Sequence, residues 1–549
     1  MGLIKAQLDK QKLRGGYYTP AKIAEFLCRW AITGDEREVL EPSSGDGNFV
    51  EAIARRFQQL GVEGKDINKR LHAVELIEEE VQKVKSRVGK LGVPGDNIVN
   101  EDFFQYINDR PEKQFDVVLG NPPFIRYQSF PEEHRAIAIE LMEQLGLHPN
   151  KLTNIWVPFL VISASRLREN GRLGMVIPAE LFQVKYAAET RVFLSEFFQR
   201  VTIVTFRRLV FEDIQQEVVL LLCEKNVENN SGIRVVELES SEDLAKMDME
   251  VIMQTPVKEL DHDSEKWTKY FLTEEEIRLL RRIKNDPRIR PAGIYLDVNV
   301  GLVTGRNDFF MLNDEVARKW NVLPFTRKVV SRSNHFKGII FSDADFQANI
   351  EAGVDGYLFL PPDEDFSLLP QACQAYIKHG QEEEYHTGYK CRIRKRWYIT
   401  PSLYDPGGFA LRQVADYPKL IVNASDTSST DTIHRVRLRD GGGVPFPVLA
   451  LSFLNSLSFA FSEITGRSYG GGVLTFEPTE IEEIPLPVLE DLALDFSMID
   501  RLVREKRIEE VLDLVDQELL IDQLHFTREE VEKLRGIWRK LSDRRQNRR

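Results

Sequence analysis

The first 225 residues alternate short apolar runs with segments in which apolar residues recur every three or four positions. The apolar runs, rich in valine, leucine and isoleucine, predict strands at 37–44, 71–76, 115–122, 173–178 and 218–225. The periodic segments between them predict amphipathic helices at 21–32, 48–60 and 77–92. Strands that alternate with helices in this way indicate an α/β fold with a mostly parallel sheet, covered by helices on both faces.

The pattern changes twice further along the chain. Residues 229–290 are polar and acidic, which predicts a helical connector. Residues 291–490 contain more aromatic residues, glycine and proline, with short irregular strands, and predict a mixed α+β domain. Residues 491–549 predict a C-terminal helical segment, and its basic end, RRQNRR, is more typical of a solvated terminus than of a DNA contact.

Composition restricts the class of protein. The chain has 549 residues, 42% hydrophobic and 29% charged, as expected of a folded chain with several domains. No apolar run reaches the ~18 residues that a membrane span needs, and the start lacks the apolar core of a signal peptide. The four cysteines are scattered without metal-ligand spacing, which predicts a cytoplasmic protein with no metal site.

The distribution of charge matters more than its sum. A formal net charge of -13 usually disfavours a nucleic-acid partner. The acidic residues are concentrated, however: residues 231–280 contain 13 acidic and 6 basic side chains, and residues 477–500 contain 8 acidic side chains and none that is basic. Two other stretches, 318–338 and 388–398, contain no acidic residue. The charge pattern therefore predicts a basic cleft on an acidic body.

The sequence VLEPSSGDGNF, at 39–49, predicts a strand that leads through a glycine-containing turn into a helix. Gly45 and Gly47 lack a Cβ atom and would let the backbone approach a ligand closely. Glu41, in the turn, would repel phosphate and attract a cationic group. A structural strand–turn–helix without a ligand is the alternative for these residues.

Two further acidic positions extend this candidate site. Glu75 ends the predicted strand at 71–76, where it could accept hydrogen bonds from ribose hydroxyls. Asp102 could accept a hydrogen bond from an adenine amine while Phe103 stacks on the ring. The ordered set predicts an adenosine without phosphate but with a positive sulfonium, that is, S-adenosylmethionine.

A second motif, Asn121-Pro122-Pro123-Phe124, directly follows the predicted strand at 115–122. The two prolines fix the backbone and lack N–H groups, so the loop presents carbonyl oxygens outward. The Asn121 side-chain oxygen and the Pro122 carbonyl could each accept one proton of an exocyclic amine, which would orient its lone pair toward a methyl group. Phe124 could stack on the base. An ordinary Asn-Pro turn is the alternative.

These motifs, in this order, resemble the γ-class adenine-N6 DNA methyltransferases of restriction–modification systems. The resemblance covers residues 15–225, through GGYYTP, LEPSSGDGNF, VEL, EDFF, GNPPF, TNIWVPF, GRLGMVIP and VFEDIQQEVVLLL. It implies a Rossmann-like methyltransferase domain at 1–228 and a target-recognition domain at 291–490. The aromatic residue after NPP is phenylalanine here where tyrosine is commoner, and stacking survives that difference.

The resemblance also implies residue roles. It assigns cofactor binding to Tyr18, Thr19, Pro20, Glu41, Gly45, Asp46, Gly47, Glu75, Asp102 and Phe103. It assigns the catalytic motif to Asn121, Pro122, Pro123 and Phe124. Phe124 and Phe211 would stack on the target adenine, which a family member rotates out of the duplex.

The two acid-free stretches combine basic and aromatic side chains, which suits phosphate neutralisation and base contacts. From them we expect contacts with double-stranded DNA by Arg327, Lys328, Arg332, Lys337, Arg392, Arg394, Lys395 and Arg396. His335 is the only one of nine scattered histidines that lies among such residues and is a candidate for DNA contact. A solvated charged face is the alternative for both stretches.

Together these features predict an enzyme that methylates N6 of adenine at a specific duplex sequence. Few residues precede Tyr18 and no nuclease motif is evident, so we expect modification only, with a separate cognate restriction endonuclease as a candidate partner. The alternatives are N4-cytosine, RNA guanine or protein glutamine methylation, because the NPP motif serves any planar amine, and a catalytically silent DNA-binding module. The 291–490 domain favours DNA, and the intact motif argues against a silent module.

Overall fold

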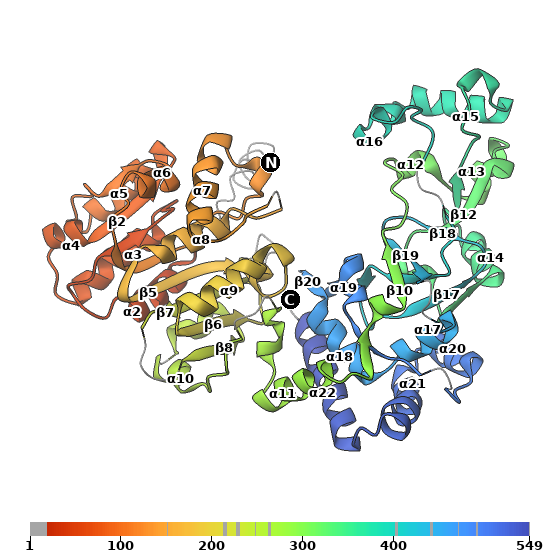
Figure 1. Cartoon of the computed structure of the whole chain (residues 1–549). Helices are drawn as coiled ribbons and strands as arrows, with labels where there is room; N and C mark the ends of the chain where they lie inside the picture. The colour runs from red at the N-terminus through yellow and green to blue at the C-terminus, as the bar shows by residue number, and fades with distance from the viewer. Residues whose placement is uncertain are drawn as a thin grey trace. The chain divides into compact units, whose positions relative to one another are not determined.

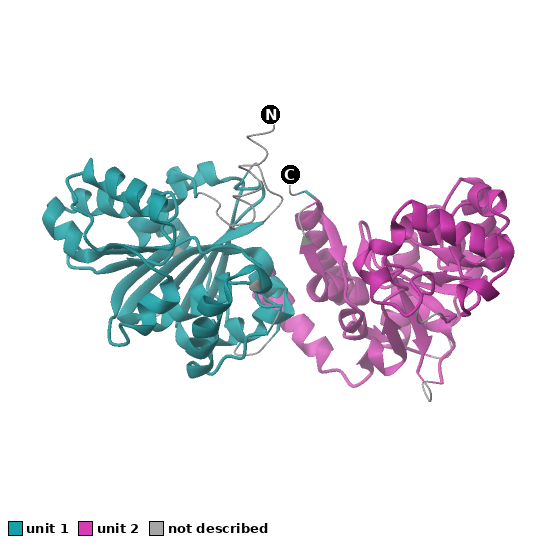
Figure 2. Ribbon diagram, turned by 90° about the horizontal axis from the view of Figure 1, so that it is seen from above, with its two compact units in different colours: residues 1–271, 547–549 teal, residues 272–546 magenta. Residues whose placement is uncertain are grey.

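The chain divides into two compact units, one formed by residues 1–271 with 547–549 and the other by residues 272–546 (Figure 2). The structure, a computed structural model, describes residues 19–547 apart from 151, 212–216, 227–230, 248, 262–264, 401–403, 440–442, 470 and 490–491. Within these residues, no single helix is long and apolar enough to cross a membrane, and one bent pair of helices, Phe446–Phe453 and Ser456–Thr465, passes by length and composition alone.

The first unit is built on an eight-stranded sheet with the order β3-β2-β1-β4-β5-β7-β6-β8 (Figure 1). Neighbouring strands are parallel except where β7 pairs with β5 and β6. This confirms the predicted α/β fold with a mostly parallel sheet. The strands are β1 (Val39–Glu41), β2 (Leu71–Glu75), β3 (Ile98–Asn100), β4 (Phe115–Gly120), β5 (Leu167–Pro178), β6 (Arg200–Phe206), β7 (Val218–Glu224) and β8 (Gly232–Leu238).

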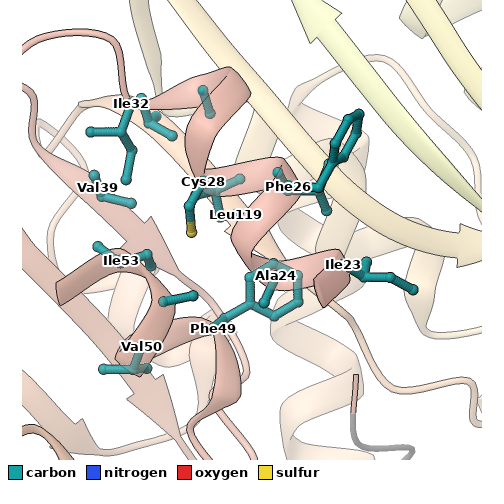
Figure 3. Packing of buried hydrophobic residues seen from close by; sticks show 14 of the residues in the cluster. Ile23, Ala24, Phe26, Cys28, Ile32, Val39, Phe49, Val50, Ile53 and Leu119 are labelled. Atoms are coloured by element: carbon teal, nitrogen blue, oxygen red, sulfur yellow. The ribbon is translucent and has the colours of Figure 1, made fainter. Parts of the chain in front are cut away.

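Two helices pack on this sheet through apolar stripes. Ile23 and Phe26 of the first described helix, Ile53 of the helix after β1, and Leu119 of β4 belong to one buried cluster (Figure 3). Burying such stripes is the main favourable term in assembling these layers. The helices of this unit are α2 (Ala21–Ala31), α3 (Asn48–Gln59), α4 (Gly64–Arg70), α5 (Glu78–Gly89), α6 (Phe103–Asn108), α7 (Glu132–Gln144), α8 (Trp156–Ser165), α9 (Ala188–Phe197) and α10 (Met249–Gln254).

Strand β1 marks the point where the strand order reverses. Strands β2 and β3 follow on one side of β1, whereas β4 pairs with its other side. In open α/β sheets, ligands bind beyond the carboxyl ends of the strands at such a switch point. The fold therefore places the loops after β1, β2, β3 and β4 at the edge of the sheet where a ligand is expected.

The predicted helical connector at 229–290 is wrong in its first part. Strand β8 lies in this range and pairs in parallel with β6, which extends the sheet. Its core, Ile233–Val236, contains β-branched residues that suit a pleated strand, but acidic residues on both sides dominate the composition. The later helix α11 (Glu274–Lys284) fits the prediction, and Thr273 and Glu276 form a capping box at its start.

The second unit is a mixed α+β structure, as predicted, with two separate hydrophobic cores. One core lies against a five-stranded sheet in the order β10 (Leu296–Asn299), β19 (Ile433–Leu438), β15 (Gly408–Leu411), β17 (Leu420–Ala424) and β13 (Ile340–Ser342). The other lies against a four-stranded sheet in the order β11 (Met311–Leu312), β14 (Tyr357–Phe359), β12 (Thr326–Val330) and β18 (Ser428–Ser429).

Short strand pairs and helices complete this unit. The remaining strands are β9 (Ile289–Pro291), β16 (Gln413–Val414), β20 (Arg467–Tyr469), β21 (Val473–Thr475) and β22 (Pro485–Pro487). The helices before the C-terminal segment are α12 (Asn307–Phe310), α13 (Asp314–Lys319), α14 (Asp343–Glu351), α15 (Gln371–Glu382), α16 (Tyr389–Arg392), α17 (Phe446–Phe453), α18 (Ser456–Thr465) and α19 (Pro478–Glu482).

The C-terminal helices α20 (Phe496–Arg504), α21 (Ile508–Val515) and α22 (Arg528–Gln546) pack onto this unit rather than forming a solvated end. Arg545, within the basic end, is 3% exposed and forms an ion pair with the buried Glu463 of α18 at 2.8 Å. The prediction of a solvated basic terminus is therefore wrong at Arg545, because its side chain is buried in an ion pair with Glu463, which is distant in sequence.

Candidate active site

The turn between β1 and α3 has the geometry that its glycines predict. Gly45 and Gly47 adopt positive φ angles of 49° and 86°, which residues with a side chain rarely adopt, and Gly47 caps the N-terminus of α3. The Gly45 amide donates a hydrogen bond to Oε2 of Glu75 at 2.8 Å. The turn after β1 and the end of β2 are thereby joined into one surface.

Glu41, the last residue of β1, has a fully buried carboxylate. Neither oxygen accepts a well-formed hydrogen bond from a described residue, although the Ser43 amide lies close by. Burial, and secondarily the charge of Glu75, raise the pKa of Glu41 well above its usual range, and the Ser43 amide opposes this rise. A buried carboxylate without a partner is costly unless a cationic or hydrogen-bonding group satisfies it.

Glu75 is held by the backbone at the end of β2. Besides the Gly45 contact, its Oε1 atom accepts a hydrogen bond from the Ile77 amide at 2.9 Å. Burial raises the pKa of Glu75, and these two hydrogen bonds oppose the rise. Because each carboxylate oxygen can accept two hydrogen bonds, a fixed Glu75 still has capacity for the hydroxyl groups of a ligand.

Asp102 is the N-cap of α6, and its Oδ1 atom accepts hydrogen bonds from the amides of Phe104 and Gln105 at 3.0 and 3.1 Å. Burial raises its pKa, against the effect of these bonds. No described residue donates a hydrogen bond to Oδ2. The Phe103 ring is 2% exposed and stacks on Phe159, with centroids 5.0 Å apart.

The N-terminal motif reaches the same turn through Asn48. The Asn48 side-chain amide donates to the Thr19 carbonyl at 2.9 Å and to Oδ2 of Asp46 at 2.8 Å. Thr19 is buried and Pro20 precedes α2 directly. Burial raises the pKa of Asp46, whose carboxylate orders the turn through Asn48. Tyr18, the remaining predicted cofactor residue of this motif, lies outside the described residues.

The Asn121–Phe124 motif follows β4 at the same edge of the sheet. The Ser43 hydroxyl donates a hydrogen bond to the Asn121 carbonyl at 3.3 Å, which links the motif to the turn after β1. No described residue donates a hydrogen bond to the Pro122 carbonyl. Phe211 belongs to the buried core cluster of this unit and Phe124 packs against the same cluster, although the two are far apart in the chain.

These residues fit an adenosine-type cofactor that carries a positive charge. The buried Glu41 carboxylate offers a place for a cationic group, and Glu75 offers fixed acceptors for hydroxyls. Within the described part of the chain, no group of three or more His, Cys, Asp or Glu is placed to hold a metal ion. The sheet edge thus combines acceptors for a cationic nucleoside with acceptors for a planar amine.

In the second unit, the predicted DNA contacts fall into two groups. Arg327, Lys328 and Arg396 form ion pairs within the unit, with Asp405, with Asp343, and with both Asp363 and Asp365, respectively. Arg394 donates to the Val303 carbonyl at 3.0 Å and lies over the Phe310 ring. The others are exposed and, among the described residues, form no ion pair: Arg332, Lys337, Arg392 and Lys395.

His335 is not a surface residue, which corrects the prediction that it contacts DNA. Its side chain is 6% exposed, and burial lowers its pKa to about 4, so the ring is neutral at pH 7. In contrast to His335, two apolar side chains at helix α16 are exposed. Tyr389, at the start of the helix, is 65% exposed, and Ile393, directly after it, is 60% exposed. An exposed aromatic ring beside cations can stack on a base.

Sequence reasoning missed three residues that shape the site. Ser43 links the two motifs, and Asn48 ties the Thr19 carbonyl to the turn. Gly120 lies against Glu41, and a side chain there would meet the Glu41 carboxylate. Only Gly120 had a readable signal, because a glycine inside a strand often marks a close approach.

Two protein families match this chain. Residues 54–211 match the Eco57I restriction-modification methylase, and residues 264–520 match the C-terminal domain of the Type II methyltransferase M.Eco57I. The chain is 22% identical to the Type II methyltransferase M.AccI of Acinetobacter calcoaceticus, over 90% of this chain and 88% of that protein. It is 21% identical to the Type II methyltransferase M.XamI of Xanthomonas campestris pv. amaranthicola, over 87% of this chain and 86% of that protein.

Among solved structures, the Type IIL restriction-modification enzyme MmeI in complex with DNA matches with a TM-score of 0.55. The match covers 95% of this chain and 72% of that one, at 13% sequence identity. It shows a shared fold across both units.

Proposed function

We propose that this chain, which belongs to the restriction–modification DNA methyltransferases, transfers a methyl group from S-adenosylmethionine to N6 of adenine in duplex DNA. The observation that carries this proposal is the position of Asn121–Phe124. The motif lies at the sheet edge that also holds Glu41 and Glu75, and the Ser43–Asn121 hydrogen bond joins the two halves.

The cofactor of this family, S-adenosylmethionine, supplies an electrophilic methyl group on a sulfonium when bound. We assign the buried carboxylate of Glu41 to its cationic part and the fixed carboxylate of Glu75 to its ribose hydroxyls. Oδ2 of Asp102 is the acceptor for the adenine amine, and Phe103 contacts the ring. Further residues of the turn and the N-terminal motif shape the binding surface: Thr19, Pro20, Gly45, Asp46 and Gly47.

The target amine is held by oxygens of the catalytic motif. The Asn121 side-chain oxygen and the Pro122 carbonyl each accept one N–H of the adenine N6 amine, and Pro123 keeps the backbone rigid. This geometry would direct the nitrogen lone pair away from the ring plane and toward the methyl group, so catalysis is positioning by fixed dipoles. The nitrogen would bond to the methyl carbon as the carbon–sulfur bond breaks, which leaves a neutral thioether, and one N–H proton would pass to solvent. Phe124 and Phe211 stack on the adenine, which offsets part of the few kcal/mol needed to rotate it out of the duplex.

The second unit contacts the duplex. Arg332, Lys337, Arg392 and Lys395 are exposed cations that can neutralise phosphates without breaking an ion pair. Arg327, Lys328, Arg394 and Arg396 already have protein partners and contribute less. The chain acts in modification, and a separate endonuclease that cuts the same unmodified sequence is its expected partner.

Long-read sequencing of DNA from methylation-deficient bacteria that express the chain tests this proposal. We expect N6-methyladenine at one position of one recurring sequence, and none with Asn121→Ala. Asn285→Ala, which changes an exposed asparagine on α11's C-terminal cap, is the matched control and should leave the pattern intact. Methylation at cytosine N4 would overturn the assignment to adenine. An absence of modified bases, with the protein folded, would overturn DNA as the substrate and favour an RNA or protein amine.

A further inference from the structure

The segment between β12 and β13, residues 331–339, presents three polar side chains to solvent. Arg332, Asn334 and Lys337 are exposed on a turn whose centre, Ser333–His335, is a short 3-10 helix. The side chains of His335 and Phe336 between them are buried and anchor the turn in the core. The turn thus separates anchoring residues from residues that face outward.

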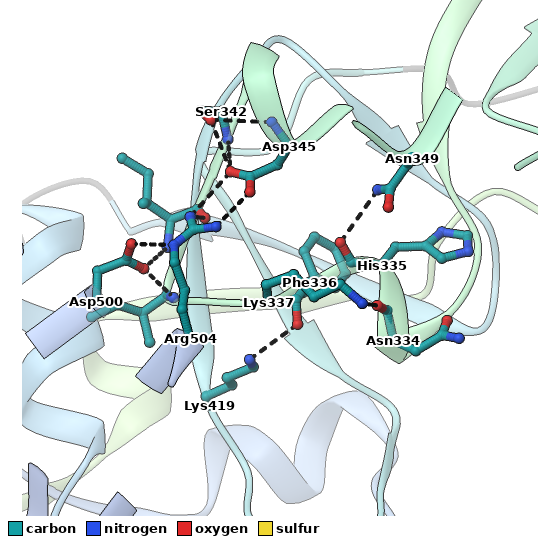
Figure 4. A network of polar contacts seen from close by, with 12 residues as sticks. Asn334, His335, Phe336, Lys337, Ser342, Asp345, Asn349, Lys419, Asp500 and Arg504 are labelled. Carbon is teal, nitrogen blue, oxygen red and sulfur yellow. Dashed lines mark hydrogen bonds and ion pairs between the residues drawn. The ribbon is translucent and has the colours of Figure 1, made fainter. Parts of the chain in front are cut away.

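One side of this turn is fixed by the C-terminal helix α20. Oδ1 of Asp500 accepts hydrogen bonds from the amides of Ile339 and Ile340 at 2.7 and 3.1 Å (Figure 4). Arg504 donates to Asp500 at 2.6 Å, to the Ile340 carbonyl at 3.0 Å, and to both oxygens of Asp345. This network holds the end of the turn at the start of β13.

Gly338 is part of the same contact. A Cβ atom at Gly338 would lie 2.1 Å from Oδ1 of Asp500, so no side chain fits while the carboxylate holds the turn.

The rest of the turn is held from other elements. The Lys419 ammonium, 9% exposed as a residue, donates to the Phe336 carbonyl at 3.3 Å, and the Asn349 side chain donates to the His335 carbonyl at 3.3 Å (Figure 4). Ser333 donates through its hydroxyl to the Gln413 carbonyl at 2.9 Å. Contacts along its whole length therefore fix the backbone from which Arg332 and Asn334 project.

The exposed side chains are of the types that read DNA bases. Arginine forms paired hydrogen bonds with O6 and N7 of guanine, and asparagine forms them with N6 and N7 of adenine, both in the major groove. A fixed backbone lowers the ordering cost of such contacts and keeps their geometry specific. In Figure 4, Asn334 lies away from Asp500 and Arg504, so the side that anchors the turn and the side that presents Asn334 are distinct.

We propose that the 331–339 turn reads part of the DNA target sequence. Arg332 and Asn334 contact base edges, with a guanine and an adenine as their preferred partners, and Lys337 contacts a phosphate. Asp500, Arg504 and Lys419 are positioning residues that act through the backbone of the turn. This inference rests on the proposed methylation of DNA and gives the C-terminal helix α20 a role in sequence recognition.

Methylation profiles of the full chain and of Arg332→Ala and Asn334→Ala test the direct contacts. Each variant should still methylate adenine but accept additional bases at one position, with discrimination there reduced about 5- to 150-fold. Lys337→Ala should weaken binding to all sequences alike and lower the dependence of log affinity on log salt by about one unit. Arg318→Ala is the matched control, because Arg318 is exposed but paired with Asp314.

The positioning role needs a measurement that loss of stability would not reproduce. Asp500→Ala should weaken the base preference at the same positions of the target sequence as the Arg332 and Asn334 variants do. Its affinity for unrelated duplex DNA should stay within about twofold. Asp500→Asn keeps one oxygen acceptor and should weaken the base preference less. Urea unfolding of each variant identifies any general loss of the fold.

The outcomes separate the two proposals. If the full chain methylates one recurring sequence, and Arg332→Ala and Asn334→Ala methylate the same sequence with the same selectivity, only the reading role of this turn is overturned. Relaxation in those two variants but not in Asp500→Ala overturns the positioning role. A folded full chain that methylates no DNA overturns the proposed function and this inference with it.

Discussion

Gly120 and Glu41 lie so close together that a Cβ atom on Gly120 would come within 2.7 Å of Oε1 of Glu41. The two residues end neighbouring strands, β4 and β1, at the switch point of the sheet. The same Cβ atom would lie 3.2 Å from Cδ of Pro42, so neither neighbour leaves room for it. The missing side chain at Gly120 therefore determines where the buried carboxylate of Glu41 can lie.

Gly120→Ala should weaken cofactor binding by displacing Glu41. A displacement of about 1 Å at a binding group can cost up to about 100-fold, and we expect at least a tenfold rise in the Kd of S-adenosylmethionine. Isothermal titration calorimetry measures this directly. Gly89→Ala is the control, since a Cβ atom there meets nothing within 4 Å. Equal affinities in both variants would contradict a role for the Gly120–Glu41 contact.

Cofactor affinity should rise with pH because Glu41 must ionise to pair with a cation. Burial raises the pKa of Glu41 in the free protein, and a bound cation favours the charged form, so binding releases a proton. Affinity therefore increases as pH rises toward and through that raised pKa, and then levels off. Calorimetry across pH, in buffers of different ionisation enthalpy, measures the proton release.

Glu41→Gln separates this effect from those of nearby carboxylates. Glu75 and Asp46 also have raised pKa values and lie near Glu41, so some pH dependence remains in this variant. We expect weaker binding and a smaller proton release. An unchanged proton release would assign the titration to Glu75 or Asp46 instead.

Removing the Phe124 ring should reduce methylation more than DNA binding. Stacking of a base on an aromatic side chain is worth about 1–3 kcal/mol, and Phe124→Ala loses it only after the base has left the duplex. We expect a fall in kcat/KM of about 5- to 150-fold, measured with tritiated methyl donor. Phe124→Tyr keeps the ring and should retain most activity. A Phe124→Tyr variant as impaired as Phe124→Ala would argue for a packing role.

The sequence predicted five strands of the sheet, β1, β2, β4, β5 and β7, and the ligand edge of the sheet, because their signals are local. Buried strands are continuous apolar runs, and the turn after β1 is marked by Gly45 and Gly47, whose positive φ angles the structure requires. Strands β3, β6 and β8 were not predicted: β3 has only three residues, and acidic neighbours outweighed Ile233–Val236 of β8 in composition. Ser43 and Gly120 were missed because their roles depend on contacts with a neighbouring strand.

Partners distant in sequence also limit what the charge pattern can predict in the second unit. The stretch 388–398 contains no acid, yet Arg396 pairs with Asp363 and Asp365, more than 30 positions earlier. Arg327 is paired with Asp405 in the same way. Local charge counts predict where cations occur but not which of them folding leaves exposed.

The difference between cations in ion pairs and exposed cations without an ion pair predicts that their removal changes the salt dependence of DNA binding unequally. Arg392→Ala and Lys395→Ala each remove an exposed cation without an ion pair among the described residues, and each should lower the slope of log affinity against log salt by about one unit. Arg396→Ala should change the slope less, because Asp363 and Asp365 already neutralise that cation. Fluorescence anisotropy with labelled duplex DNA at several salt concentrations measures all three. If Arg396→Ala lowers the slope of log affinity against log salt by a full unit, the ion pairs of Arg396 with Asp363 and Asp365 break when the protein binds DNA.

The buried pair of Arg545 and Glu463 should be essential to the second unit's stability. Arg545 donates to both Glu463 oxygens, to the Ala415 carbonyl and to the Gly472 carbonyl, so α22 is tied to α18 and to the β20–β21 turn. Burial raises the pKa of Glu463, and Arg545 opposes that rise. Arg545→Ala leaves a buried carboxylate without its cation, which typically costs about 3–5 kcal/mol in the free energy of unfolding.

Urea unfolding followed by tryptophan fluorescence measures this cost, because Trp538 of α22 lies 5.1 Å from the Phe459 ring of α18, centroid to centroid. Arg539→Ala is the matched control: this arginine of the same helix is 52% exposed, and its pair with Glu509 should contribute no more than about 1 kcal/mol. Adding Glu463→Gln to Arg545→Ala removes the unpaired charge and should recover part of the loss. If Arg545→Ala and Arg539→Ala unfold at the same urea concentration, the buried pair does not hold α22 in place.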